Sequence, residues 1–287
     1  MFFNRRILFP VDFSNHPFAV PPAIEELIDG PNVELVLLHV LDAVCPSASK
    51  LAYRIDGLDL LARRHFRHCK VTRRVDYGQP ASRILEYIRS NDIGMVVMPA
   101  RDSEGFGKGP LGRVSSQVLA EASCPLWLEW RCAAPKKRER FSAASICCAV
   151  DGASLDEQIV REAAAVADRL GGKLTIVSPI EPEPKRYAVP LPRPITPAPE
   201  FLRETDRINR LRARVAPHAE VMVTTGWREA VISRALRGRR ADLLIAGDCG
   251  ATVLAAEGTC PVLRLKLQPG DVGYFGNPWP REYQRIA

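Results

Sequence analysis

The sequence predicts an α/β fold of two tandem domains, each built on a five-stranded parallel sheet flanked by helices. The first observation behind this prediction is an internal repeat: the stretch around Asp12 recurs around Asp151, and the stretch around Cys124 recurs around Cys260. The second is that short apolar runs alternate with amphipathic stretches in both copies, as parallel strands and crossover helices do. The chain of 287 residues gives each copy the length of an ordinary domain with its own core.

Five apolar runs in each copy are predicted strands. They are rich in Val, Ile and Leu and show little alternation with polar residues, which is typical of strands covered on both faces. The predicted strands span 6–11, 33–40, 70–76, 94–99 and 125–130 in the first copy, and 145–150, 173–178, 219–224, 242–247 and 261–266 in the second.

Amphipathic stretches predict helices at 18–29, 80–90 and 114–123 in the first copy, and at 155–170, 228–238 and 251–258 in the second. The helix at 155–170 has the clearest signals. Ser154 and Glu157 have the spacing of a capping box at its start, and Gly171 and Gly172 would end it. The helix at 18–29 should be short or broken at its start, because prolines lie before and within its first turn.

Three segments lie outside the repeat. We predict a first domain over 1–130, a basic linker over 131–144, a second domain over 145–267 and a C-terminal tail over 268–287. The second copy gains nine residues in a proline-rich insertion over 179–199, which should form an extended loop. It then loses twelve residues after its fourth apolar run. The tail carries several aromatic residues, so we expect it to pack on a domain or on a partner.

The composition excludes several classes of partner. No stretch approaches the roughly 20 consecutive apolar residues that a membrane span needs, so no membrane partner is expected. The net charge is +7, but the Lys and Arg residues are mostly dispersed along the chain, and we do not expect a nucleic-acid partner. The N-terminus runs into an apolar strand without the pattern of a signal peptide, which predicts a cytoplasmic protein.

Little in the sequence indicates redox, metal or catalytic chemistry. The eight cysteines contain no CxxC pair and are expected to be reduced and structural. A redox-sensing role for the neighbouring Cys147 and Cys148 stays open, although alternate faces of a strand would hold the two thiols apart. His65 and His68 have a metal-compatible spacing, but no further ligands accompany them, so no metal is predicted. No hydrolase, zinc-protease or P-loop motif occurs, and no enzyme activity is expected.

Candidate binding residues lie where predicted strands end. Ligands of open parallel sheets bind at the carboxyl ends of the strands, and Asp12 follows the first strand while His39 ends the second. After the fourth strand, a glycine-rich stretch over 103–112 leads into a helix at Arg113. Glycines let the backbone approach a phosphate closely, and the start of a helix offers free N–H donors. This loop is therefore a candidate anion site. The alternative is an ordinary surface loop. His39 is expected to be a satisfied core histidine.

Four motifs follow one another in the first copy: Ile7-Leu8-Phe9-Pro10-Val11-Asp12-Phe13-Ser14, Leu37-Leu38-His39-Val40, Gly78-Gln79-Pro80 and Val114-Ser115 through Cys124-Pro125-Leu126. In this order they resemble a universal stress protein domain, and the second copy resembles the same family more weakly. The resemblance spans roughly 6–130 and 145–266. It implies a tandem universal stress protein made of two Rossmann-like domains.

The resemblance also implies a nucleotide site, from which both copies depart. ATP-binding members carry an Asp that ends the first strand and a loop of the form Gly-x2-Gly-x9-Gly-Ser/Thr after the fourth. At that spacing the first copy has Pro99, Asp102, Gly112 and Arg113, so only the third glycine is kept. Asp102 places a carboxylate where the family has backbone against phosphate, and two anions about 4 Å apart repel by several kcal/mol at a partly exposed site.

The second copy departs in a different way. Asp151 is kept, and Gly247 and Gly250 supply the first Gly-x2-Gly, but the twelve-residue deletion removes the rest of the loop. The candidate nucleotide- or anion-binding residues are therefore Asp12, Val40, Gly112, Arg113, Ser115, Asp151, Gly247 and Gly250. The two aspartates have an alternative role as caps of the following turn or helix.

These features lead to two hypotheses of function. The first is a non-catalytic stress-response or regulatory protein with degenerate nucleotide sites. The second is a module that binds ATP, AMP or another phosphorylated ligand through its first domain; no other cofactor is a candidate. From the resemblance, we expect the domains to pair through their last strands as an intramolecular pseudo-dimer, which would also cover an exposed sheet edge. A homodimer of the whole chain and an unidentified protein partner stay open.

Overall fold

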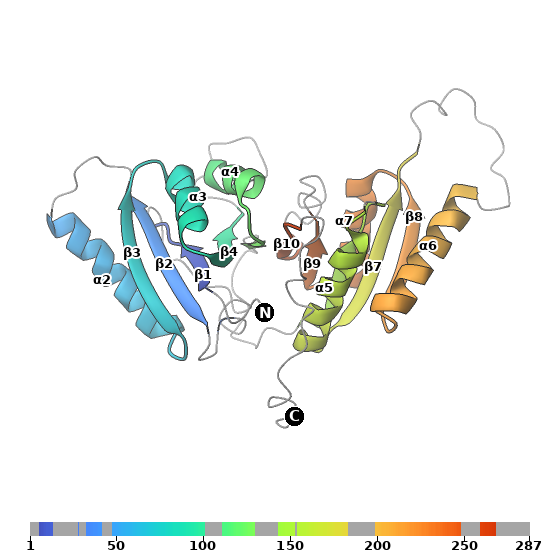
Figure 1. The fold of residues 1–287 in the computed structure, drawn as a ribbon, viewed down its shortest axis with the longest axis horizontal. Helices are drawn as coiled ribbons and strands as arrows, with labels where there is room; N and C mark the ends of the chain where they lie inside the picture. Colours follow the sequence, from blue (N-terminus) through green and yellow to red (C-terminus); the bar gives the residue numbers. More distant parts are fainter. Residues whose placement is uncertain are drawn as a thin grey trace.

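One continuous sheet of ten strands runs through both copies (Figure 1). The computed structural model describes residues 6–13, 28, 33–41, 48–100, 111–129, 143–152, 154–182, 199–247 and 259–267. The strands of the first half are β1 (Arg6–Pro10), β2 (Glu34–Leu41), β3 (Lys70–Tyr77), β4 (Ile93–Pro99) and β5 (Leu126–Glu129). Those of the second half are β6 (Ser145–Ala149), β7 (Lys173–Ile180), β8 (Glu220–Thr225), β9 (Leu243–Ala246) and β10 (Val262–Arg264).

The strand order is β3-β2-β1-β4-β5-β10-β9-β6-β7-β8. All strand pairs within each half are parallel, and only the central pair of β5 and β10 is antiparallel. The predicted fold class is therefore confirmed, and each predicted strand matches an observed one to within two residues at either end. Val, Ile and Leu runs locate such strands well because both faces of the sheet are buried.

The predicted pairing of the last strands is also confirmed. Leu263 of β10 lies opposite Trp127 of β5, and both side chains are buried. Next to this pair, the buried Arg264 donates from Nη2 to the carbonyl of Leu119 at 2.8 Å, and both Nη atoms lie 3.4 Å from the carbonyl of Ala122. The two halves are thus joined by backbone pairing, apolar packing and a buried arginine.

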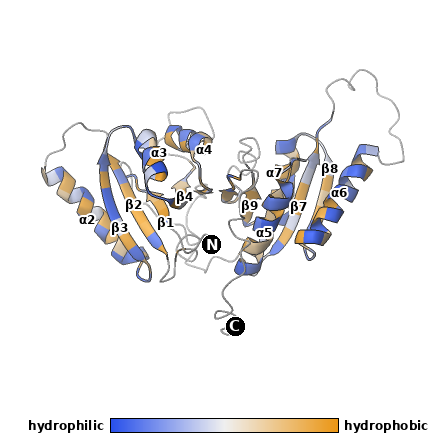
Figure 2. Ribbon diagram, viewed as in Figure 1, coloured by the Kyte–Doolittle hydropathy of each residue, from blue (hydrophilic) through white to orange (hydrophobic). Residues whose placement is uncertain are grey.

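Helices cover both faces of the sheet. The described helices are α2 (Ala48–His65), α3 (Pro80–Ser90), α4 (Arg113–Glu121), α5 (Asp156–Leu170), α6 (Pro199–Val215) and α7 (Arg228–Arg239). Buried residues of α2, α5 and α6 join one core cluster, and those of α3, α4 and α7 join the cluster on the opposite face. Figure 2 shows the corresponding pattern: β1 and β2 are largely hydrophobic, whereas the helices carry both kinds of residue.

Two helices were not predicted, and the start of one was predicted wrongly. The helices that were not predicted are α2 and α6, each of which buries only two residues. The capping-box prediction is wrong: α5 begins at Asp156 after Leu155, with no side-chain cap. Instead, Asp156 itself accepts hydrogen bonds from the preceding turn. The predicted end at Gly171 is confirmed by its left-handed φ of 65°.

Several predictions fall outside the described residues. They concern the linker, the tail, the helix at 251–258, the loop over 101–110 and most of the helix at 18–29, of which only Ile28 is described, as helical. Of the proline-rich insertion, Pro179 and Ile180 belong to β7 and Pro199 begins α6, while 183–198 lie outside the described part. Among the described helices, none is long and apolar enough to cross a membrane.

Candidate functional site

The candidate site of the first half lies where its strand order reverses. β1 is bonded to β2 on one side and to β4 on the other, so the connections from their carboxyl ends leave in opposite directions and open a crevice. Asp12 lies two residues after β1, and Val40 is the last but one residue of β2. Gly112 and Arg113 lie at the start of α4, which follows β4. The topology therefore brings these four candidates to one edge of the sheet.

The backbone before Asp12 is held firmly. The N–H of Val11 donates to the carbonyl of Leu38 at 2.8 Å, and His39 Nδ1 donates to the carbonyl of Val11 at 2.8 Å. Burial lowers the pKa of His39, so its ring is neutral at physiological pH. The ring of Phe13 packs edge-on against His39, with ring centres 4.9 Å apart. His39 is thus a core residue that orients the turn, but it is only half satisfied, because its buried Nε2 has no hydrogen-bond partner in the described part of the chain. Asp12 projects from that turn at an exposed position.

The start of α4 is tied to β4. Gly112 is the N-cap residue, and its own N–H donates to the carbonyl of Ala100 at 2.9 Å. Ser115 is only 1% exposed, and its hydroxyl donates to the carbonyl of Pro99 at 2.8 Å. Both groups are therefore engaged within the protein. Arg113 is exposed in the first turn of α4 and is the candidate of this loop best placed to meet an anion from solvent.

In the second half, Asp151 occupies the place of Asp12 but has charged neighbours. The N–H of Val150 donates to the carbonyl of Val177 at 3.0 Å, which repeats the arrangement before Asp12. The carboxylate of Asp151 lies 3.3 Å from Arg228 Nη1, and Arg228 Nε lies 3.6 Å from a carboxylate oxygen of Glu181. Asp151 is thus part of an ion-pair group at this edge of the sheet.

A second network fills the edge beside Asp151. Asp156 is 2% exposed, and its carboxylate accepts from the backbone N–H groups of Asp151 at 3.3 Å and Gly152 at 3.0 Å. The same carboxylate accepts from Arg207 Nη2 at 2.8 Å. Arg207 also donates to both carboxylate oxygens of Glu204, at 2.7 and 2.8 Å. A carboxylate of the protein itself therefore occupies the N–H donors that follow β6.

Ser178 of β7 completes this network by donating its hydroxyl to Glu204 Oε1 at 2.5 Å. The hydrogen bonds from Arg207 lower the pKa of Glu204 despite its partial burial. Burial raises the pKa of Asp156, and the bond with Arg207 opposes that shift only in part. Arg207 shares its Nε and Nη2 donors between two carboxylates, so its positive charge is neutralised within the protein.

The glycine retained after β9 has a packing role. A Cβ at Gly247 would lie 2.8 Å from Ile159 Cδ1 of α5, so the absent side chain allows the strand end to approach the helix. Gly250, the other retained glycine, lies outside the described residues, as do Asp102 and the glycine-rich stretch up to Pro110.

The remaining candidates do not form reactive sites. Cys147 and Cys148 are fully buried and belong to the core clusters on opposite faces of the sheet. Burial raises the pKa of Cys147 to about 11 and raises that of Cys148 further, which suppresses the reactive thiolate. His65 ends α2 and His68 is exposed beyond it. Among the described residues, no group of three metal-ligating side chains occurs.

Both halves match one family model, that of the universal stress protein family. The matches span residues 4–128 and 144–256, which together cover most of the chain. The chain belongs to the universal stress protein family. The two matches coincide with the two halves of the sheet, so the protein is a tandem universal stress protein.

Solved structures share the fold of this universal stress protein over both halves. A universal stress protein from Archaeoglobus fulgidus DSM 4304 is 16% identical with a TM-score of 0.66, covering 92% of this chain and 97% of that one. A protein from Pseudomonas aeruginosa UCBPP-PA14, described as a universal stress protein, is 17% identical with a TM-score of 0.62, covering 91% and 92%. At such identities the likeness extends to the fold alone. No curated protein matches in sequence.

Sequence reasoning about this universal stress protein missed the network around Arg207. Glu204 and Arg207 have the i,i+3 spacing of a helical ion pair, which could have been found had α6 been predicted. The contact of Arg207 with Asp156 could not have been found in this way. The two residues are far apart in sequence and meet only because α6 packs beside α5.

Proposed function

We propose that this stress-response protein is a non-catalytic regulatory module whose nucleotide sites are degenerate. Family membership supports its role in the stress response. The observation that carries the finer proposal is the hydrogen bonding of Asp156, whose carboxylate takes the backbone donors of Asp151 and Gly152. A ligand that approached the end of the first strand of this half would find these donors taken, and a phosphate there would be repelled by the carboxylate of Asp151.

The first half supports the same proposal less directly. The N–H of Gly112 and the hydroxyl of Ser115 are both used in contacts with β4 or the residue after it. The sequence also lacks the first two glycines of the family loop in this half. We therefore assign the conserved scaffold to assembly and partner binding, with an unidentified protein as the regulated partner and a homodimer of the chain as a further assembly.

A cytoplasmic location is part of this proposal. Cys124, Cys147 and Cys148 are buried thiols that form no disulfide, which agrees with a reducing compartment. Fractionation of the producing cells, followed by detection of the chain in each fraction, tests this part separately from the nucleotide question.

The test of the main proposal is turnover of ATP by the whole chain. Purified protein is incubated with ATP and Mg²⁺, and the release of phosphate is measured beside the Asp12→Ala variant. We expect both proteins to give the rate of the buffer alone. Hydrolysis by the natural sequence that is lost in Asp12→Ala would overturn the proposal.

A second candidate function is binding of ATP or AMP by the first domain alone. The observation that favours it is the exposure of Asp12 and Arg113 at the same edge of the sheet. Calorimetric titration with ATP, ADP and AMP distinguishes the two copies through matched variants. If the first domain binds, Asp12→Ala abolishes the heat of binding and Asp151→Ala leaves it unchanged; absence of heat with every nucleotide removes this candidate.

A further inference from the structure

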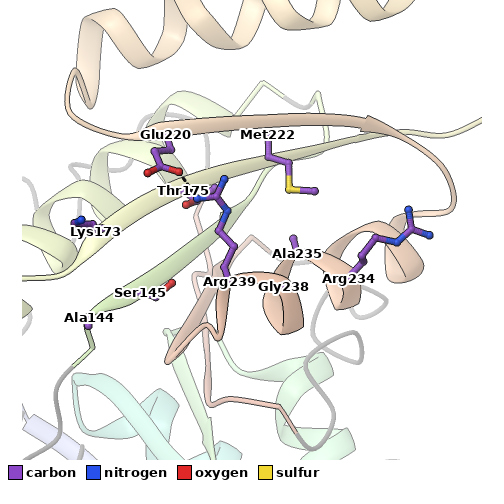
Figure 3. Close-up of a pocket in the computed structure, with 10 residues that line it drawn as sticks. All are labelled: Ala144, Ser145, Lys173, Thr175, Glu220, Met222, Arg234, Ala235, Gly238 and Arg239. Atoms are coloured by element: carbon purple, nitrogen blue, oxygen red, sulfur yellow. Dashed lines mark hydrogen bonds and ion pairs between the residues drawn. The ribbon is translucent and has the colours of Figure 1, made fainter.

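A groove opens at the amino ends of the strands of the second half, on the edge of the sheet opposite to the family's ligand edge. Its volume is about 640 Å³, within the range of small-molecule sites. It lies between the first residues of β6, β7 and β8 and the last turns of α7 (Figure 3). The lining residues are Ala144, Ser145, Lys173, Thr175, Glu220, Met222, Arg234, Ala235, Gly238 and Arg239.

The groove exists because its helical wall carries small residues. Ala235 and Gly238 face it from α7, and a Cβ built at Gly238 would meet no atom within 4 Å. In Figure 3, Met222 of β8 and Ala235 of α7 face each other in the middle of the row of lining residues and make this part of the groove apolar. The interior is therefore open and partly apolar rather than filled by side chains.

The charge of the lining is positive. Arg239 forms an ion pair with Glu220, so these two charges largely offset each other. Lys173 and Arg234 remain, and neither forms an ion pair with any residue in the described part of the chain. In Figure 3, Lys173 and Arg234 lie toward opposite ends of the row of labelled residues. A ligand in the groove would thus meet two cations that form no ion pair among the described residues.

At the equivalent place in the first half, Glu34 forms ion pairs with Arg6 and Lys70. The strand registers match Arg6 to Ser145 and Glu34 to Lys173, since each pair lies side by side at the start of its first two strands. Arg6 donates to Glu34 Oε2 at 3.1 Å and to the carbonyl of Asn91, just after α3, at 3.2 Å. Thr72 also donates to Glu34, at 3.0 Å. An arginine thus spans the space in the first half.

In the second half, Ser145 stands in place of Arg6 and Lys173 in place of Glu34. Ser145 is too short to reach across the groove, and Lys173 puts a cation where the first half has the carboxylate of Glu34. This combination removes the internal bridge and reverses the charge at the same time.

We propose that this groove is a binding site for a small organic anion that carries phosphate or carboxylate groups. Lys173 and Arg234 bind the anionic groups, the hydroxyl of Ser145 donates a further hydrogen bond, and the carbon skeleton lies on Met222 and Ala235. The site belongs to the second half alone and is independent of the nucleotide edge.

The experiment uses the methionine methyl groups as local reporters. Met222 is the only methionine of the second copy, and Met98 lies near the carboxyl end of β4 in the first. The whole chain is labelled with 13C at the methionine methyl carbons and titrated at constant ionic strength with inorganic phosphate, glycerol 3-phosphate and succinate. We expect at least one organic anion to shift the Met222 resonance in a saturable manner while Met98 stays unchanged.

Variants make the assignment specific. Lys173→Gln and Arg234→Gln should each raise the Kd obtained from the Met222 titration about tenfold. This is the cost of losing one charge-assisted hydrogen bond. Gly238→Leu should block the groove without clashing. Arg237→Gln is the matched control, because it removes the same charge from α7 outside the lining.

Three results would overturn the proposal. The first is a Met222 resonance that responds to none of the three anions. The second is an equal effect of Arg237→Gln and Arg234→Gln, which would indicate general screening. The third is a response to a polyanion such as heparin alone. A shift of Met98 with ATP would instead contradict the degenerate nucleotide site of the first half and would leave the groove unaffected.

Discussion

At the scale of single residues, burial decides which groups retain reactivity. Cys147 and Cys148 look like a redox pair in the sequence, but the sheet places them in different cores where the thiolate is suppressed. Glu129 at the end of β5 is the opposite case. Trp127 Nε1 donates to its carboxylate at 3.1 Å, yet burial raises the pKa of Glu129 to about 7. An ordinary acidic residue thereby becomes a group that titrates near neutral pH.

This shift predicts a pH dependence of stability. Glu129 is protonated in both states below its ordinary pKa of 4.5, and between 4.5 and about 7 only the unfolded state loses the proton. Raising the pH through this window therefore favours unfolding, by about 2–3 kcal/mol in total. Urea unfolding at pH 5 and pH 8 should show the natural protein losing that much stability relative to Glu129→Gln. If the free energy of unfolding changed equally with pH in both proteins, Glu129 would have an ordinary pKa.

At the scale of elements, tight connections between helix and strand determine the local geometry. The turn from α5 to β7 contains two consecutive glycines for different reasons. Gly171 has a φ of 65°, which disfavours other residues, but open space surrounds it. A Cβ at Gly172 would lie 2.0 Å from the carbonyl oxygen of Ala143, just before β6. The sequence signals only the first of these constraints, because the second arises from a contact with a distant segment.

The two glycines predict different costs of substitution. Gly171→Ala should lower the free energy of unfolding by about 1 kcal/mol, the cost of a strained backbone. Gly172→Ala should lower it by about 3 kcal/mol, since backbone atoms must move apart. Urea unfolding of both variants measures this. Equal losses would mean that the segment before β6 yields easily and that the close approach has no structural role.

At the scale of the whole molecule, the two halves form one sheet rather than two separate bodies. β5 and β10 are short, and Arg264 reinforces their pairing by donating to carbonyls at the end of α4. These carbonyls carry the partial negative charge of a helix C-terminus, which favours a cation beside them. The arginine thus links the last strand of the second half to a helix of the first.

We predict a single thermal unfolding transition for the natural chain, because melting of either half exposes an edge strand and the buried Arg264. Arg264→Met should lower the stability by about 2–4 kcal/mol, as it leaves buried carbonyls without a donor. Arg203→Met, at an exposed position of α6, is the matched control and should have no effect. Two separate transitions in calorimetry of the natural chain would contradict the coupling of the halves.

The sequence by itself determined the repeat, the positions of all ten strands and the parallel character of each half, because apolar runs locate strands that are buried on both faces. It also located Asp12 and Asp151 after corresponding strands, and it predicts an altered phosphate loop in both copies. It did not determine α2 and α6, each of which buries only two residues.

Only the tertiary structure decided what the altered edges contain. Asp156, Glu204 and Arg207 meet because α5 and α6 pack side by side, and no local pattern encodes that contact. The groove beside α7 arises in the same way, since Ser145, Lys173 and Arg234 come from three elements. The periodicity of a sequence shows which face of a helix or strand is buried. A site depends on which of these faces meet, and this is determined by the packing of the whole chain.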